Sequence, residues 1–223
     1  MIGAVQDGPG VLLDGDGWVA GVFAVDLAGL AAQAAAVADV AVIAIDMPIG
    51  LPDGGRRQAD LLAREAVGPR WRSVFMTPVR AALAEDTYHA AARVSVQVTG
   101  GGISQQAYAL RPRIIEADAW AAASTVPVIE VHPEVSFATL AGAHLPHPKR
   151  CWAGMVLRRS LLAGAGITVP DDLGQLGAHA AADDVYDATA AAWSARRYAT
   201  GTATSYPDPP QTFSDGHPAA IRA

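Results

Sequence analysis

The sequence contains a single cysteine and no long apolar run, and each shortage excludes a class of protein. Cys151 is the single cysteine, so a disulfide framework and a zinc site built from cysteines are both excluded. No apolar run approaches the roughly 20 residues that a membrane-spanning helix needs. Residues 1–10 carry no basic residue and no apolar core of the kind found in signal peptides. We therefore expect a cytoplasmic protein with no membrane partner.

Charge is also scarce, and it is unevenly distributed. Charged residues make up 17% of the 223 positions and hydrophobic residues 51%, a composition typical of one folded domain with a substantial core. The net charge of −6 argues against broad, charge-driven adhesion to nucleic acid. No lysine or arginine precedes Arg56, yet residues 56–113 contain nine arginines and four acids. This segment either presents arginines to an anionic substrate or forms a solvated helical surface.

An apolar run over residues 40–45 ends on Asp46 and is followed by Pro48 and Pro52. An unbroken apolar run rich in β-branched residues is typical of a strand buried on both faces of a sheet. The prolines direct the chain away from the sheet, because proline cannot donate to a strand ladder. Asp46 is therefore predicted at the carboxyl edge of the sheet, where ligands of α/β proteins collect. Capping of the turn after the strand is the alternative role.

Further elements around this strand define one expected domain, residues 1–223. The β-formers on both sides of an Asp16-Gly17 turn predict a hairpin over residues 11–25, with Asp14 at the end of its first strand. Alanine-rich stretches predict helices, and helices separated by glycine-rich breaks suggest that residues 53–115 form a helical insertion or lid. We expect an extended tail after residue 200. The expected helices include residues 27–38, 79–93, 112–124 and 153–163.

Two later segments carry clustered acids. Residues 126–134 predict a short strand on which Glu130 and His132 share a face, because side chains alternate along a strand. This pair could bind a metal or supply a base, or His132 could be a hydrogen-bonded edge histidine. Asp184 and Asp187 are three residues apart at the start of a helix, so they share a face of it. Capping accounts for one aspartate, whereas two neighbouring carboxylates repel unless a cation or a proton relieves them.

Acids therefore end three predicted strands and begin a late helix. Oxygen ligands of this kind are those that Mg²⁺ and Mn²⁺ prefer, and two such ions can clamp the attacking and leaving oxygens of a phosphodiester. The expected metal ligands are Asp14, Asp46, Glu130, Asp184 and Asp187. The expected catalytic residues are Asp46, Glu130, His132, Asp184 and Asp187.

The same motifs resemble the DUF429 family of predicted nucleases, which have an RNase H-like fold related to the RuvC resolvases. The resemblance rests on residues 14–19, 45–52, 72–78, 106–118, 130–134 and 183–188, which are spread over nearly the whole chain. It implies an α/β fold with a mixed central sheet flanked by helices, and metal-binding acids at Asp14, Asp46, Glu130 and either Asp184 or Asp187. One departure is that only two strands are apparent before the helix at residue 27.

The expected activity is metal-dependent hydrolysis of phosphodiester bonds in nucleic acid, or of a smaller phosphoester, with Mg²⁺ or Mn²⁺ as cofactor. Arg72, Gln106 and Lys149 are the candidate substrate contacts. One alternative is an actin-like ATP-dependent phosphotransferase, although 223 residues hardly hold the two sheets of that group. Another is a non-catalytic binding protein whose acids serve stability. The sequence leaves the oligomeric state open.

Overall fold

The computed structural model describes residues 2–4 and 8–223, with the backbone alone for residues 2–4. The chain divides into two compact units. Unit 1 comprises residues 1–46, 124–204 and 222–223, and unit 2 comprises residues 47–123 and 205–221. The expected insertion, residues 53–115, lies within unit 2. Among the described residues, no helix is long and apolar enough to cross a membrane.

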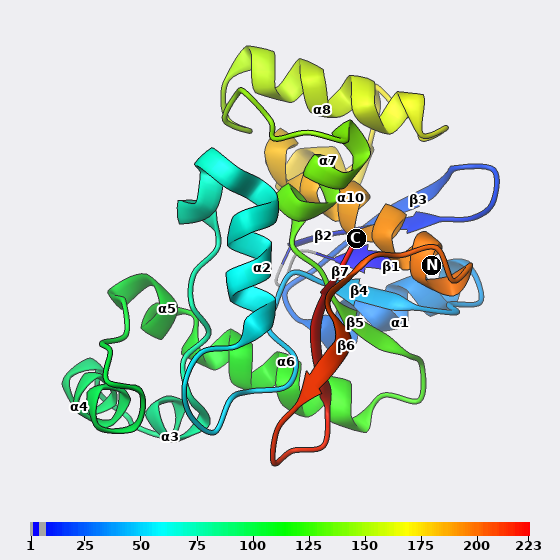
Figure 1. Ribbon diagram of the computed structural model, residues 1–223. Coiled ribbons are helices and arrows are strands. Elements are labelled where there is room, and N and C mark those ends of the chain that lie inside the picture. The colour runs from blue at the N-terminus through cyan, green and yellow to red at the C-terminus, as the bar shows by residue number, and fades with distance from the viewer. Residues whose placement is uncertain (1, 5–7) are drawn as a thin grey trace. The chain divides into compact units, whose positions relative to one another are not determined.

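The sheet of unit 1 has the strand order β3-β2-β1-β4-β5 (Figure 1). Antiparallel pairing joins β1, β2 and β3, and parallel pairing joins β1, β4 and β5. The expected α/β class with a mixed sheet is therefore confirmed. The strands are β1 Ile2–Ala4, β2 Gly8–Leu13, β3 Trp18–Ala24, β4 Ile43–Ile45 and β5 Val128–Glu130.

Strand β1 is the strand that sequence reasoning missed before the first helix. It lies between β2 and β4 and pairs with both of them. Only Ile2 among its three residues is a strong β-former, so the segment lacks the pattern that predicts a strand. The expected hairpin is present as β2 and β3, and Asp14 directly follows β2.

Helix α10, Ala182–Ala199, packs against β1, β2 and β4. Val11 and Leu13 of β2 share a core cluster with alanines of α10, and Ala44 of β4 packs with Ala191 and Ala195. The small alanine side chains let the helix approach the sheet closely, which explains why this segment is alanine-rich. The other helices of unit 1 are α1 Leu27–Val37, α7 Pro133–Ala141, α8 Trp152–Gly164 and α9 Gln175–His179.

Gly154, in the first turn of α8, lies so close to Pro148 that a Cβ atom would collide with the Pro148 carbonyl oxygen. We expect Gly154→Ala to lower the free energy of unfolding by about 1–3 kcal/mol, because backbone atoms cannot move aside as a flexible side chain would. Gly164, at the end of the same helix, has open space around it, so Gly164→Ala should be neutral or slightly stabilising. Urea unfolding of the two variants measures the difference, and equal stabilities would contradict the contact.

Unit 2 contains short helices and a C-terminal pair of strands. The helix expected over residues 79–93 is wrong in its bounds, because it stops at Leu83 and a new helix begins at Tyr88. Thr87 caps the new helix by accepting a hydrogen bond from the Ala90 N–H. The helices are α2 Gln58–Val67, η1 Gly68–Ser73, α3 Arg80–Leu83, α4 Tyr88–Thr99, α5 Gln105–Ala109 and α6 Arg111–Ala123.

The C-terminal tail is extended, as expected, and it forms β6 Ser205–Thr212 and β7 Pro218–Arg222, which are neighbours in the sheet order. The turn between them contains Asp215 and Gly216. The Asp215 carboxylate accepts hydrogen bonds from the Leu51 N–H at 3.0 Å and from Arg80 at 2.5 Å. The turn is thereby tied to the segment that follows residue 46 in unit 2.

Candidate active site

Asp46 directly follows β4, at the edge of the sheet where the parallel strands end. The register places Ala4 and Ile45 level with Glu130 at this edge. Asp46 as a whole residue is half-buried, whereas its carboxyl group is enclosed by protein. Its burial raises the pKa of Asp46 to about 7, although the positive charge of Lys149 acts in the opposite direction. A carboxyl group with this pKa exchanges its proton at neutral pH.

Helix α10 brings three aspartates to the same side of unit 1. Its N-cap residue is Ala181, which makes no side-chain capping bond, so capping does not account for Asp183 or Asp184 in the first turn. Asp187, one turn further, is buried with 5% of its surface exposed. The positive end of the helix dipole favours negative charge in the first turn. Asp187 lies deeper in the protein than the first turn, so its negative charge needs a different stabilising partner.

Lys149 is that partner. Its ammonium group donates a hydrogen bond to Asp187 Oδ2 and lies 3.5 Å from Asp183 Oδ2 and 3.8 Å from Asp184 Oδ1. Burial of the ammonium group opposes its charged form, but attraction by Asp187, and then by Asp183 and Asp184, outweighs burial and raises the pKa of Lys149. The single lysine of the chain therefore remains a cation among carboxylates.

The loop that carries Lys149 is fixed to helix α8. The buried guanidinium group of Arg158 donates to the carbonyl oxygens of His147 at 3.3 Å and Gly154 at 3.1 Å. Cys151 caps the helix, since its Sγ accepts a hydrogen bond from the Gly154 N–H at 3.4 Å. These contacts hold the residues on both sides of Lys149.

Arg158 also makes a buried ion pair with Glu134, in the first turn of α7. Nη2 of Arg158 lies 2.6 Å from Oε1 of Glu134. Within the described part of the chain, the other oxygen of Glu134, Oε2, and Oδ1 of Asp187 are buried without a hydrogen-bond partner. Two buried carboxylate oxygens thus keep lone pairs for a proton, a cation or a ligand.

The carboxyl groups of the site act on one another. Burial raises the pKa of Asp187 to about 7 despite the charge and the hydrogen bond of Lys149, and repulsion from Asp46 and Glu134 contributes to the rise. Burial also opposes ionisation of Asp183, but the Arg150 hydrogen bond and the Lys149 charge outweigh it and lower the pKa of Asp183. Asp46, Glu134 and Asp187 therefore face a common region, and we call these three residues with Lys149 the carboxylate site.

Asp14 lies away from the carboxylate site. Leu12 of β2 pairs with Ile2, and Ile2 pairs with Ile43 at the start of β4, so β2 ends at the opposite edge of the sheet from Asp46. The exposed Asp14 carboxylate accepts hydrogen bonds from the Asp16 and Gly17 N–H groups at 2.8 and 3.0 Å. The structure thus gives Asp14 a turn-forming contact and does not bring it to the other predicted ligands.

Glu130 and His132 lie at the carboxyl end of β5, which runs parallel to β4. Ile129 and Val131 pack with Ala191 and Ala195 of α10, so alternation along the strand turns Glu130 to the other face of the sheet. Glu130 ends β5 and is 5% exposed, and His132 is the N-cap residue of α7. The roles predicted for both residues remain predictions.

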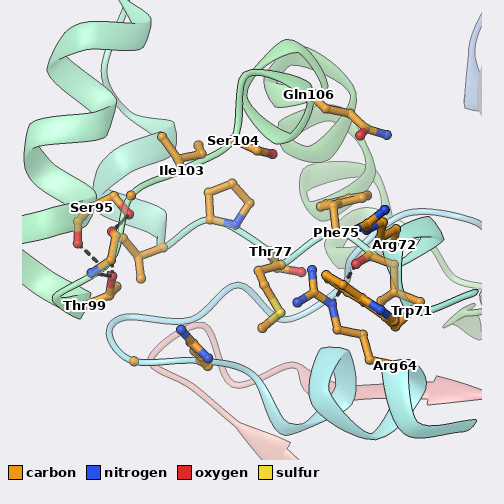
Figure 2. A pocket seen from close by; sticks show the side chains of 18 residues that line it. Arg64, Trp71, Arg72, Phe75, Thr77, Ser95, Thr99, Ile103, Ser104 and Gln106 are labelled. Atoms are coloured by element: carbon orange, nitrogen blue, oxygen red, sulfur yellow. Dashed lines mark hydrogen bonds between the residues drawn. The ribbon is translucent and has the colours of Figure 1, made fainter. Parts of the chain in front are cut away.

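Arg72 and Gln106, the other predicted substrate contacts, lie in unit 2. Both line one pocket together with Arg64, Trp71 and Phe75 (Figure 2). Lys149 differs from them, because it belongs to unit 1 and contacts carboxylates. The expected substrate contacts therefore fall into two separate groups.

Sequence reasoning missed Glu134, Asp183 and Arg158. Glu134 follows Pro133 at the start of α7, and a proline followed by an acid is typical of a helix start, so the sequence could have indicated its place. Arg158 lies in a helix that also carries Arg159, which is half-exposed on its side chain, and no pattern separates the buried arginine from the exposed one.

The site is built from oxygen donors and one ammonium group. In residues 2–4 and 8–223, no set of three or more His, Cys, Asp or Glu side chains is arranged to hold a metal ion. The positive charge next to Asp187 is that of Lys149. The geometry can hold and exchange protons near pH 7, and it offers carboxylate oxygens to a hard cation.

A family model described as "Protein of unknown function (DUF429)" matches residues 11–212. No curated protein and no solved structure matches the chain. The matched segment contains Asp46, Glu134, Lys149 and Asp187, which is the whole carboxylate site.

Proposed function

The chain belongs to the DUF429 family, and we propose that it is a divalent-metal-dependent nuclease that hydrolyses phosphodiester bonds at the carboxylate site. The observation that carries the proposal is the pair Asp46 and Asp187. These carboxyl groups come from distant segments of the chain, and both have a pKa raised to about 7. The positive charge of Lys149 acts on both and lowers the pKa of each. Perturbed groups of this kind cluster at functional sites.

The arrangement of strands supports an RNase H-like assignment within this proposal. Three antiparallel strands, β1 to β3, precede α1, and β4 and β5 then continue the sheet in parallel from β1. This is the mixed sheet that the family resemblance implies. Asp46 lies at the carboxyl edge of the sheet, and Asp187 is on the helix packed against it.

The donor set of the site fits Mg²⁺ or Mn²⁺. Mg²⁺ is commonly held by one or two carboxylates, with water and substrate phosphate oxygens completing its shell, so a three-residue cage is not required. Asp46 and Asp187 would hold the ion, and the partnerless oxygens of Asp187 and Glu134 provide further lone pairs. When bound, the ion supplies positive charge that polarises a phosphoryl oxygen.

The protein side chains have separate tasks in this proposal. Lys149 stabilises the ionised form of Asp187 and competes with the divalent ion for it, because both carry positive charge. Without the ion, Asp46 has a pKa of about 7 and exchanges its proton at neutral pH, and a bound ion would keep it as the carboxylate. Arg158 positions Glu134 and the Lys149 loop together.

The test is cleavage by the purified protein with Mn²⁺ or Mg²⁺. The substrates are single-stranded DNA, double-stranded DNA, RNA and bis(p-nitrophenyl) phosphate. We expect cleavage that requires the divalent ion and stops when a chelator is added. Absence of cleavage in every combination would contradict the proposal. Transfer of phosphate from ATP to another molecule would instead support an actin-like phosphotransferase.

A further inference from the structure

A pocket of about 290 Å³ in unit 2 is lined by three arginines, Arg56, Arg64 and Arg72, and by no aspartate or glutamate. Arg56 lies in the loop before α2, Arg64 is on α2 and Arg72 is on η1. All of its lining residues belong to the same unit. In a protein of net charge −6, this is a local concentration of positive charge.

Two of the arginines are held around Trp71. The guanidinium carbons of Arg64 and Arg72 lie 5.3 and 5.2 Å from the centre of the Trp71 ring. Arg64 also donates from Nε to the Val74 carbonyl oxygen at 2.9 Å, which leaves its Nη groups for a ligand. Figure 2 shows Arg64, Trp71 and Arg72 together on one side of the pocket, with Ser95 and Thr99 on the other. Arginines held in this way lose less conformational entropy when they bind an anion.

The pocket arginines differ from other arginines of unit 2, which are neutralised. Arg80 pairs with Asp118 at 3.0 Å and Asp215 at 2.5 Å, and Arg111 pairs with Asp86 at 3.2 Å. Across the described residues, Arg56, Arg64 and Arg72 have no carboxylate at ion-pair distance. Their charge is therefore available to an anion from outside the chain.

Part of the remaining pocket wall is apolar, and several hydroxyl side chains also line it. Val79 and Ile103 belong to a buried cluster against which Phe75 packs, and Phe75 and Met76 are half-buried. The exposed amide of Gln106 can both donate and accept hydrogen bonds. A ligand that fits this pocket has an anionic end and a flat, mostly apolar body with polar edges. The volume of about 290 Å³ suits a small molecule or one residue of a polymer.

We infer that this pocket binds a nucleotide, with its phosphate on Arg56, Arg64 and Arg72 and its base against the apolar wall near Phe75. The guanidinium group of arginine can bind two phosphate oxygens at once. The edge of the base would form hydrogen bonds with the side-chain amide of Gln106. The nucleotide is either free or the phosphorylated end of a strand. The inference does not rest on the proposed nuclease activity, since none of the pocket residues belongs to the carboxylate site and binding needs no divalent ion.

Isothermal titration calorimetry with AMP in metal-free buffer tests this inference. We expect a dissociation constant of about 0.1 mM that weakens as salt is added, because the contacts are charge-assisted. Arg72→Ala and Arg56→Ala should each weaken binding about tenfold. The matched control is Arg93→Ala, an exposed arginine on α4 of the same unit and outside the pocket, which should bind AMP as the wild type does.

Comparison ligands separate the parts of the inference. Adenosine and inorganic phosphate should each bind at least about tenfold more weakly than AMP, since each lacks one half of the ligand. A short 5′-phosphorylated DNA strand that binds more tightly than AMP identifies a strand end as the source, and equal affinity identifies a single nucleotide. The inference is overturned if AMP fails to bind at about 10 mM, if adenosine or phosphate binds as tightly as AMP, or if the pocket variants match the wild type.

Discussion

Asp187→Asn is expected to lower metal-dependent phosphodiester cleavage at least about 100-fold while the protein remains folded. The substitution keeps the size of the side chain and removes the negative charge that faces Lys149 and Asp46. Steady-state rates with Mn²⁺ at pH 8 measure the effect. Asp46→Asn should have an effect of similar size, because the two carboxyl groups share one region.

Asp14 provides the control for that experiment. Asp14→Asn should leave the rate unchanged, since Asp14 lies at the opposite edge of the sheet. A large loss in Asp14→Asn, or unchanged turnover in Asp187→Asn, would contradict the placement of the site.

The stability of the protein provides an independent check on the raised pKa of Asp187. Asp187 binds a proton in the folded state between about pH 4 and 7 and not in the unfolded state, so the ionisation penalty develops as pH rises through that window. Asp187→Asn should therefore gain thermal stability relative to the wild type as pH rises from 5 to 8.

Lys149→Met is expected to destabilise the protein by about 2–4 kcal/mol at pH 8, because it leaves the buried Asp187 carboxylate without its counter-charge. Lys149 acts to lower the pKa of both Asp46 and Asp187, so its removal raises both further. At pH 5 the two carboxyl groups can be protonated, and the loss should be smaller. Urea unfolding at the two pH values measures the difference.

The matched comparison for Lys149→Met is Arg159→Met, which breaks an exposed pair with Asp171 on the surface of unit 1. Exposed pairs contribute little, so this variant should unfold as the wild type does at both pH values. The double variant Lys149→Met with Asp187→Asn should recover most of the stability lost at pH 8. Equal destabilisation of Lys149→Met at pH 5 and pH 8 would show that packing of the lysine side chain, not its charge, is what matters.

The sequence predicts where β4 ends and where α10 begins, but it does not predict the direction of every strand. Asp46 and Asp187 could be located because an apolar run and a helix start place them. Asp14 was also at a strand end, but β1 was not recognised. With β1 in the sheet, β2 runs antiparallel to it, and the end of β2 falls at the opposite edge. One unrecognised strand of three residues thus reversed the position of a predicted ligand.

The partners of the carboxylates were harder to predict than the carboxylates themselves. Lys149 was expected to contact substrate, whereas its ammonium group binds Asp187 of α10, 38 residues further along the chain. Arg158 is fully buried, which the adjacent Arg159 does not indicate. Burial of a charge depends on how α7 and α8 pack, and local sequence patterns contain little information about such packing.

Glycine at position 154, which has no side chain, affects turnover as well as stability. The contact of Gly154 with Pro148 fixes the backbone one residue before Lys149. The ammonium group lies 3.5 Å from Asp183 and 3.8 Å from Asp184, so a shift of the loop changes its attraction to both carboxylates. A methyl group at position 154 would push the loop and so change the electric field at Asp46 and Asp187. A residue with no functional group thereby helps to set the acidity of the site, and its effect would appear as a shift in the pH of half-maximal rate.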